Sequence, residues 1–401
     1  MSLIFIIYES CNSSYLRTLF LPLYHRLSQN GFEVDVIRIT PACTCQEKHA
    51  EVAVTSSRIR LHSLEISFRR PLSIINCVLR LNSILKYTLR KRKRLIVVLR
   101  SYVPAFFALF SFICRRSRIK WVYDCDGIAS LEALEYRAST ILRRLFYTSL
   151  VYFEKFIVYF SVGLIARSSS TLNYYGVDKR TSISRHQLIL DNCRDVNQLR
   201  NTPVASPNLS NINRKTLGIK DHSLVFCHLG SIGKQYMIET EFEILQSLYN
   251  FGLDVHFLII NNLGQQGLVS SFLSPSKFPI TYVQSKPDEV LNYLRLSDIG
   301  FSLRIDSESM KHVKPLKNRE YLFAGNPIVY TSNTGDKSRF PSEIGFLYDI
   351  AENDPETLLD WVNNFQLHSE PIRNRCIEYA NQNFSLEKDV KRLKTFFHSF
   401  T

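Results

Sequence analysis

The chain has 401 residues, of which 45% are hydrophobic and 21% charged, with 50 Lys and Arg against 36 Asp and Glu. This length suits two domains that each bury a core, and the composition excludes a low-complexity or solenoid repeat protein. The charge is uneven, because residues 1–200 carry 30 basic and 14 acidic side chains, which accounts for the whole positive excess.

The first half alternates between apolar runs and helical patterns. Residues 3–8 form a continuous apolar run, typical of a parallel strand that is covered on both faces. A helical pattern over 15–29 ends at Gly31. Further elements are predicted as strands at 33–39, 95–99, 119–123 and 163–166 and as helices at 104–114 and 131–160. Strands that alternate with helices indicate a doubly wound parallel sheet.

Segment 58–120 holds 16 basic residues and a single acid, Glu65. The basic residues cluster at Arg69-Arg70, Arg90–Arg94 and Arg115–Arg118, close to apolar and aromatic runs. A solvated face without a partner, nucleic-acid binding and docking on an anionic membrane would each explain them. No nucleic-acid-binding fold accompanies the clusters, so we expect no nucleic-acid partner. We favour an anionic membrane surface, where each basic residue contributes about 1 kcal/mol.

Targeting signals are not evident in the sequence. Glu9 interrupts the N-terminal apolar run, and Glu154-Lys155 interrupts the longest apolar stretch, 145–166. The nine cysteines are scattered, and the one close pair, Cys43 and Cys45, lacks the further ligands of a metal site. We therefore predict reduced thiols in a cytoplasmic protein that associates peripherally with the inner face of the cell membrane.

A polar stretch near 195–222 cannot bury a core and is predicted to be the domain linker. A second alternation follows it, with strands at 223–228, 254–260, 280–283 and 298–303, a helix at 238–250 and a last helical stretch from Glu370 onward. The predicted divisions are a first domain 1–196, a linker 197–222, a second domain 223–383 and a C-terminal helix 384–401.

The most informative stretch runs from Pro315 to Pro327. Pro315 suits a first helical turn, Gly325 suits the left-handed residue that ends a helix, and Pro327 prevents continuation. Within this helix Lys317, Glu320 and Tyr321 share one face. A carboxylate on a helix with a basic N-terminal end suits a nucleotide site, and an exposed helix with ion pairs is the alternative.

A glycine-containing loop follows strand 223–228 and precedes helix 238–250. Its residues Gly230, Ser231, Gly233 and Lys234 would let backbone N–H groups approach a phosphate. A tight turn from strand to helix would have the same composition, so both interpretations stay open.

These two segments resemble the donor site of the glycogen-synthase-like glycosyltransferases. The resemblance rests on Pro-x-Lys-x-x-Glu-Tyr-Leu-x-x-Gly-x-Pro at 315–327, on Gly335-Asp336, and on the glycine loop followed by Tyr236. It implies an α/β fold of GT-B architecture, in which two Rossmann-like doubly wound domains face a cleft and the C-terminal helix crosses back to the first domain. It further implies a nucleotide-diphosphate-sugar donor and neither metal nor cofactor.

The resemblance assigns roles residue by residue. Glu320 matches the second glutamate of the paired-glutamate motif and is expected to contact the ribose, whereas the first glutamate is replaced by His312. His312 either hydrogen-bonds the sugar or is an ordinary loop histidine. Lys314 and Lys317 are candidates for phosphate charge. Arg304 is another, because Ser231 stands where many relatives have an arginine.

In the first domain, Asp124-Cys125-Asp126-Gly127 ends a predicted strand and resembles a family segment of the form Asp-x-Arg-Gly. Asp124 and Asp126 are therefore catalytic or acceptor-side candidates, and Arg100, at the end of strand 95–99, is an acceptor-side candidate. Ser10–Ser14 stands where the family often has a Gly-Gly loop.

The expected function is retaining transfer of a hexose to a lipid-linked or oligosaccharide acceptor in surface-polysaccharide biosynthesis. A catalytically inactive scaffold of the same fold that docks on membranes is one alternative, and a UDP-sugar 2-epimerase is another.

Overall fold

The computed structural model describes residues 1–9, 15–42, 59–92, 94–110, 118–176, 186–191, 193, 212–261, 267, 276–286, 289–335, 340–349, 352 and 355–400. Contacts divide the chain into unit 1, Met1–Asn192 with Glu387–Thr401, and unit 2, Cys193–Leu386. The sequence predictions for Ser10–Ser14, Cys43, Cys45, Arg115, Arg116 and Asp336 lie outside the described residues.

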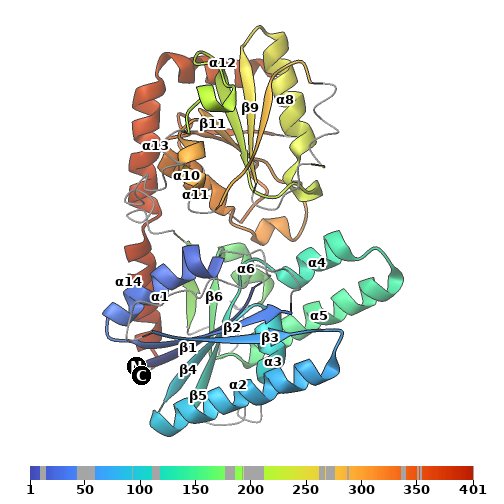
Figure 1. Cartoon of the computed structure of the whole chain (residues 1–401), viewed down its shortest axis with the longest axis vertical. Helices are drawn as coiled ribbons and strands as arrows, with labels where there is room; N and C mark the ends of the chain where they lie inside the picture. Colours follow the sequence, from blue (N-terminus) through green and yellow to red (C-terminus); the bar gives the residue numbers. More distant parts are fainter. Residues whose placement is uncertain are drawn as a thin grey trace. The chain divides into compact units, whose positions relative to one another are not determined.

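Unit 1 is built on a parallel sheet in the order β3-β2-β1-β4-β5-β6-β7, as expected for a doubly wound domain (Figure 1). Its strands are β1 (Ser2–Tyr8), β2 (Glu33–Pro41), β3 (Ile59–Ile66), β4 (Leu95–Arg100), β5 (Ile119–Asp124), β6 (Gly163–Ala166) and β7 (Gln187–Ile189). Its helices are the π-helical turn η1 (Leu16–Phe20), α1 (Leu21–Gln29), α2 (Pro71–Lys91), α3 (Tyr102–Leu109), α4 (Ala129–Arg137), α5 (Ile141–Phe160), α6 (Ser169–Tyr174) and α14 (Leu386–His398).

The alternation of side chains along β1 explains how both faces of this sheet are covered. Ile4 and Ile6 belong to a core formed with the inner sides of α2, α3 and α5. Phe5 points to the opposite face, where it stacks on Tyr24 of α1 at 4.0 Å between ring centroids and meets Phe397 at 6.2 Å. The continuous apolar run of β1 therefore fills two cores at once.

The C-terminal helix α14 returns to unit 1, as the predicted fold requires. Its apolar residues Leu386, Val390, Leu393, Phe396 and Phe397 are all buried. A Cβ at Gly163 would lie 2.9 Å from the ring of Phe396 and 2.7 Å from that of Phe400, so only glycine lets the two rings pack against β6. Arg392 Nη1 lies 2.9 Å from Asp191 Oδ2.

Unit 2 is built on a parallel sheet in the order β10-β9-β8-β11-β12-β13. Its strands are β8 (Leu224–Leu229), β9 (Val255–Asn261), β10 (Ile280–Gln284), β11 (Ile299–Ser302), β12 (Ile328–Tyr330) and β13 (Gly345–Leu347). Its helices are the 3-10 turns η4 (Lys215–Leu217), η5 (Lys234–Tyr236) and η6 (Met310–His312), with α8 (Ile238–Asn250), α10 (Val290–Leu294), α11 (Leu316–Ala324), α12 (Pro355–Leu367) and α13 (Ser369–Asn383).

Contacts divide the two units between Asn192 and Cys193. The linker is predicted at 197–222, and its described part, residues 212–222, packs on unit 2. Arg214 donates to Leu296 O at 3.0 Å and to Asp298 Oδ2 at 2.8 Å, and Ile219 is buried. One long arginine side chain and one apolar anchor therefore tie a polar segment to the second core.

The structure differs from the sequence prediction at two places in unit 1. The predicted helical region 131–160 is divided into α4 and α5, because Thr140 caps the second helix by accepting from Arg143 N at 3.3 Å. Strand β3 and helix α2 lie in the basic segment and were not predicted. None of the described helices is long and apolar enough to span a membrane.

Candidate functional site

In unit 2 the predicted donor-site residues lie where the strand order reverses. The chain continues from β8 to β9 on one side and returns to β11 on the other, so the crevice at the carboxyl ends of β8 and β11 is a topological switch point. Gly230 directly follows β8, and Arg304 lies two residues after β11. Open α/β sheets bind their ligands at this position.

Buried hydrogen bonds hold the glycine loop in place. Gly230 has a φ of +111°, which favours glycine, and its carbonyl oxygen accepts from Asn261 Nδ2 at 2.9 Å. The imidazole of His228 is fully buried, with Nδ1 2.7 Å from Glu241 Oε2 and Nε2 3.2 Å from Ser231 O. Side chains of β8, β9 and α8 therefore hold the loop in place.

Helix α11 is attached to the same strands through Tyr321. Leu229 N donates to the Tyr321 hydroxyl at 2.7 Å, and that hydroxyl lies 3.1 Å from the carbonyl oxygens of Cys227 and Phe301. The ring lies against Gly300, where a Cβ would come within 2.4 Å of it. Gly325 ends the helix with a φ of +85°, as predicted. Tyr321 thus positions the face that carries Lys317 and Glu320.

Two buried cations meet at the ring of Tyr236. The Arg304 guanidinium carbon lies 4.3 Å and Lys317 Nζ 6.0 Å from the ring centroid. Lys317 is 6% exposed, and among the described residues its ammonium group has no hydrogen-bond partner. Burial, and secondarily the nearby charge of Arg304, lowers the pKa of Lys317 to about 7. An anion entering here would supply the partner that this lysine lacks.

The other predicted donor-side residues have different surroundings. Glu320 is half-buried on α11, and His312 is buried in η6 with Nε2 3.7 Å from Glu308 Oε1. Lys314 is half-buried just before α11, whereas Lys234 is exposed in η5. Ser231 and Gly233 are half-buried in the loop. The structure thus gathers Arg304 and Lys317 around Tyr236, and the individual binding roles stay predictions.

In unit 1 the predicted acidic residues belong to a group of four charges at the carboxyl ends of β4, β5 and β6. Arg100 reaches Asp124 at 2.7 Å and Asp126 at 2.6 Å through its two terminal nitrogens. Arg167 reaches the same two carboxylates at 2.7 Å and 3.4 Å. Arg167 and Asp124 are buried, whereas the side chain of Asp126 is 47% exposed. Asp126 is therefore the most exposed of the four groups, and Arg100 is partly exposed beside it.

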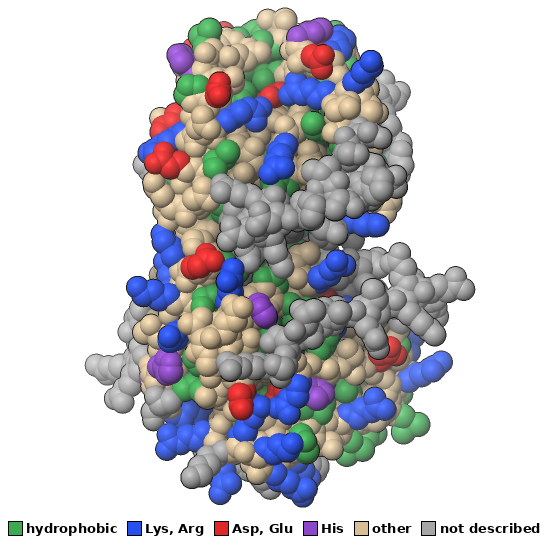
Figure 2. Space-filling model, turned by 60° about the vertical axis from the view of Figure 1, so that its left-hand side comes forward, with side chains coloured by type: hydrophobic (Ala, Val, Ile, Leu, Met, Phe, Trp, Pro, Cys, Tyr) green, Lys and Arg blue, Asp and Glu red, His purple; other side chains and the backbone are tan. Residues whose placement is uncertain are grey.

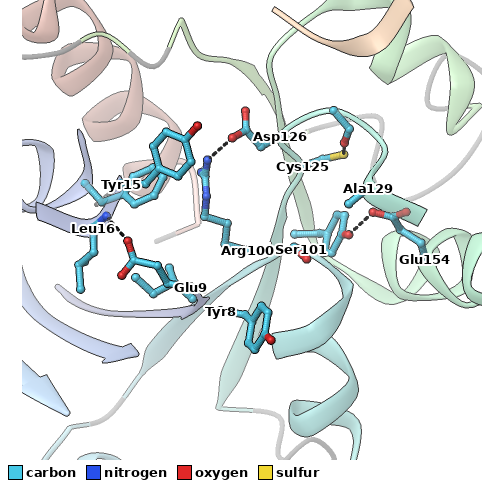
Figure 3. Close-up of a pocket in the computed structure, with 14 residues that line it drawn as sticks. Tyr8, Glu9, Tyr15, Leu16, Arg100, Ser101, Cys125, Asp126, Ala129 and Glu154 are labelled. Atoms are coloured by element: carbon cyan, nitrogen blue, oxygen red, sulfur yellow. Dashed lines mark hydrogen bonds and ion pairs between the residues drawn. The ribbon is translucent and has the colours of Figure 1, made fainter. Parts of the chain in front are cut away.

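A pocket of about 180 Å³ opens beside this group (Figure 3). The guanidinium of Arg100 lies 3.9 Å above the centroid of the Phe20 ring. On another side Glu154 of α5 accepts hydrogen bonds from Tyr123 and Ser130, and burial raises the pKa of its carboxyl group. The lining comprises Ile7, Tyr8, Glu9, Tyr15, Leu16, Phe20, Arg100, Ser101, Tyr123, Cys125, Asp126, Gly127, Ala129 and Glu154.

No protein-family description and no curated protein sequence matches this chain. Solved structures do match over its whole length. Sucrose-phosphate synthase from Thermosynechococcus elongatus has a TM-score of 0.69 at 12% identity, covering 100% of this chain and 98% of its own. Anabaena HepE in complex with UDP-glucose has a TM-score of 0.66 at 14% identity and covers 100% of both chains. WaaG, a glycosyltransferase involved in lipopolysaccharide biosynthesis, has a TM-score of 0.62 at 16% identity, covering 97% and 98%.

The chain has the GT-B fold. Unit 1 and unit 2 are the two Rossmann-like domains of that fold, and α14 is its returning C-terminal helix. The sequence resemblance is thereby supported at the level of the fold.

Two residues of this GT-B chain that contact the predicted sites were not predicted from the sequence. Arg167 directly follows β6, so the rule that places ligand residues at the carboxyl ends of parallel strands would have found it. Glu154 stands within an apolar helix, where an acidic residue indicates a buried hydrogen-bonded carboxyl group. From the sequence, Glu154 was interpreted only as a residue that interrupts the apolar stretch 145–166.

Proposed function

We propose that the chain transfers a hexose from a nucleotide-diphosphate sugar to a lipid-linked or oligosaccharide acceptor, with retention of anomeric configuration, in surface-polysaccharide biosynthesis. The supporting observation is the pair of buried cations, Arg304 and Lys317, beside a glycine loop at the switch point of unit 2. A diphosphate supplies a partner for the Lys317 ammonium group, which has none among the described residues, and UDP-glucose is bound by the similar HepE structure.

In the proposed reaction, negative charge develops on the diphosphate as it leaves, and the site must stabilise that charge. The bond between the anomeric carbon and the diphosphate oxygen breaks, and the acceptor hydroxyl oxygen forms the new bond on the same face of the sugar. The proton of that hydroxyl passes to the departing phosphate oxygen, so no further base is needed. Arg304 and Lys317 stabilise the nucleoside diphosphate as it leaves. Glu320, on the same helix face as Lys317, holds the ribose hydroxyls.

Nucleotide binding is tested by thermal unfolding in the presence of UDP or GDP. A nucleotide at roughly 100 times its Kd raises the free energy of unfolding by about 2.7 kcal/mol. We expect this protection for the wild-type protein and its loss in Glu320→Ala, because the ribose then loses its hydrogen-bond acceptor. Glu239→Ala, at an exposed position of α8, is the matched control and keeps the protection. Absence of protection by every nucleotide would favour the inactive scaffold.

We further propose that unit 1 docks on an anionic membrane through the outer sides of α2 and α5. Both helices contact α3, and their inner sides belong to one core. Their outward-facing apolar residues are Leu72, Ile75, Leu79 and Tyr87 on α2, and Ile141, Leu142, Leu145, Phe146, Tyr152, Phe156, Tyr159 and Phe160 on α5. Helix α2 has no acidic residue and α5 has only the buried Glu154.

The charge on these two helices has one sign. Their exposed ionisable groups include Arg80, Lys86, Arg90 and Lys91 on α2 and Arg143, Arg144 and Lys155 on α5. Figure 2 shows Lys and Arg side chains outnumbering acidic ones on the visible surface of unit 1. An apolar surface this extensive, surrounded by cations, is typical of a surface that inserts into a headgroup layer.

Flotation with lipid vesicles separates the apolar and the electrostatic contributions to membrane binding. We expect binding to phosphatidylglycerol vesicles but not to phosphatidylcholine vesicles, and weaker binding as salt increases. The double variant Leu142→Glu and Phe146→Glu is expected to lose binding at every salt concentration. Leu367→Glu, at a 79% exposed position of unit 2, is the control and floats normally. Equal flotation of all three proteins would contradict membrane docking by α5.

A further inference from the structure

We propose that the pocket of unit 1 binds an uncharged sugar ring of the acceptor, so that the chain extends an existing glycan and does not glycosylate a lipid phosphate directly. This inference rests on the proposed transferase function and names the acceptor class. It follows from three properties of the pocket: its charge balance, its wall chemistry and its rigidity.

The charges at the pocket cancel. Arg100 and Arg167 are paired with Asp124 and Asp126, and Glu9 is paired with Arg38 at 2.9 Å. Burial raises the pKa of the Glu154 carboxyl group, which adds no positive charge in either protonation state. Three arginines are therefore matched by three carboxylates, and the described residues leave the pocket no excess positive charge for a phosphate. Unit 2 differs, because there the ammonium group of Lys317, close to Arg304, has no hydrogen-bond partner among the described residues.

The walls combine aromatic surfaces with hydrogen-bonding groups, which is the chemistry that a sugar ring requires. Tyr8 and Tyr15 line the pocket and are partly exposed, so their rings can cover the C–H face of a pyranose. Asp126 and the planar guanidinium of Arg100 lie together at one side, where an acceptor and a donor can serve neighbouring hydroxyl groups. A bare alkyl phosphate would use neither feature.

The polar side of the pocket is held rigidly. Asp126 forms ion pairs with both arginines, and the guanidinium carbon of Arg100 lies 3.9 Å over the ring centroid of Phe20. Ser101 lines the pocket at φ 74° and ψ 169°, a region almost restricted to glycine, and its N–H donates to Asp124 O at 3.1 Å. Strained backbone next to a fixed carboxylate is characteristic of a preorganised binding site.

The inference places the reaction in a sequence. A transfer that attaches the first sugar to its carrier must come before, because this pocket recognises a sugar that is already in place. The product again presents a terminal sugar, which suits a subsequent transfer of the same class.

Saturation-transfer NMR with methyl glycosides tests the inference without a nucleotide. A panel of methyl glucoside, galactoside, mannoside and N-acetylglucosaminide is added to the full chain, with decyl phosphate as the competing ligand class. We expect at least one glycoside to bind and Asp126→Asn and Tyr15→Ala to weaken it about tenfold, since each removes one of the two recognition elements. Asp360→Asn, the same change at an exposed position of α12, keeps the affinity.

Three results would overturn the inference: no glycoside binds although UDP or GDP stabilises the protein, glycoside binding is unaffected by Asp126→Asn and by Tyr15→Ala, or decyl phosphate binds in competition with the glycosides. Circular dichroism of the two variants verifies that they are folded. Failure of nucleotide protection would instead contradict the proposed transferase function, so the two failures are distinguishable.

Discussion

Lys317→Met is expected to stabilise unit 2 and, at the same time, to abolish protection by nucleotides. Lys317 is 6% exposed, and no described residue provides its ammonium group with a hydrogen-bond partner. The groups that influence its charge are Arg304, Glu241 and Cys227, with the ring of Tyr236 6.0 Å away. Methionine fills the same elongated space without a charge to desolvate. A residue kept at a cost in stability is best explained by ligand binding.

The stability that Lys317→Met gains over the wild type should be largest at low pH and should decrease as the pH rises. Burial lowers the pKa of Lys317 from 10.5 to about 7, so between these values the unfolded chain binds a proton that the folded chain does not. The free energy of unfolding of the wild type therefore rises with pH across this window. Below about pH 7 the loss of stability caused by the buried charge of Lys317 is complete. The expected difference in the free energy of unfolding between Lys317→Met and the wild type is on the order of 5 kcal/mol at pH 6 and about 2 kcal/mol at pH 9.

Urea unfolding at pH 6 and pH 9, followed by a signal from unit 2, measures the stability difference between Lys317→Met and the wild type. The chain has two tryptophans, Trp121 in β5 of unit 1 and Trp361 in α12 of unit 2, so a Trp121→Phe background makes fluorescence report on unit 2. Lys234→Met, at an exposed lysine of η5, is the control and should leave the midpoint nearly unchanged. Destabilisation of Lys317→Met at pH 6 would show that this lysine is an internal structural group.

Arg167→Met is expected to destabilise unit 1 by about 3–5 kcal/mol, because it removes one partner of a buried ion pair. The guanidinium is 2% exposed and lies 2.7 Å from Asp124, which is 6% exposed. After the substitution Arg100 must neutralise both Asp124 and Asp126 alone. The double variant Arg167→Met and Asp124→Asn should recover much of the loss, since the buried negative charge is then removed as well.

A Trp361→Phe background makes fluorescence report on unit 1 for this measurement. The control is Lys220→Met, which breaks an ion pair with Asp254 at 3.4 Å where the lysine is 60% exposed. Pairs of this kind contribute less than about 1 kcal/mol. A loss for Arg167→Met no larger than that of the control would mean that water reaches Asp124 and that the four charges at the pocket are loosely held.

The bounds of two helices of unit 2, α8 and α11, agree closely with the sequence prediction. Helix α8 has the predicted bounds, and α11 ends at Gly325 as expected, because glycine and proline impose backbone geometry without help from distant residues. Tyr321 was placed on the same face as Lys317 and Glu320. Its role as the attachment of α11 to β8 and β11 depends on backbone atoms far away in the sequence, which a local pattern does not show.

The sequence was less informative in unit 1. Strand β3 and helix α2 were not predicted, because the charge of segment 58–120 was interpreted as a surface property and its apolar periodicity was not used. The exposed apolar residues of α5 belong to the same helix as the buried Glu154, and only the fold shows which side of the helix faces the core. The pairing of Arg167 with Asp124 joins two strands whose spacing in the sequence gives no contact information.

The return of α14 to unit 1 has a consequence for the order in which the protein can fold during synthesis. Proteins are made from the N-terminus, and domains usually fold as they leave the ribosome. Here Phe5, Phe32 and Gly163 lack their contacts with Phe396, Phe397 and Phe400 until residues 387–400 have been made, and these residues follow the whole of unit 2. Unit 2 is therefore the first to have its complete sequence, and the domain that is translated first is the last to be finished.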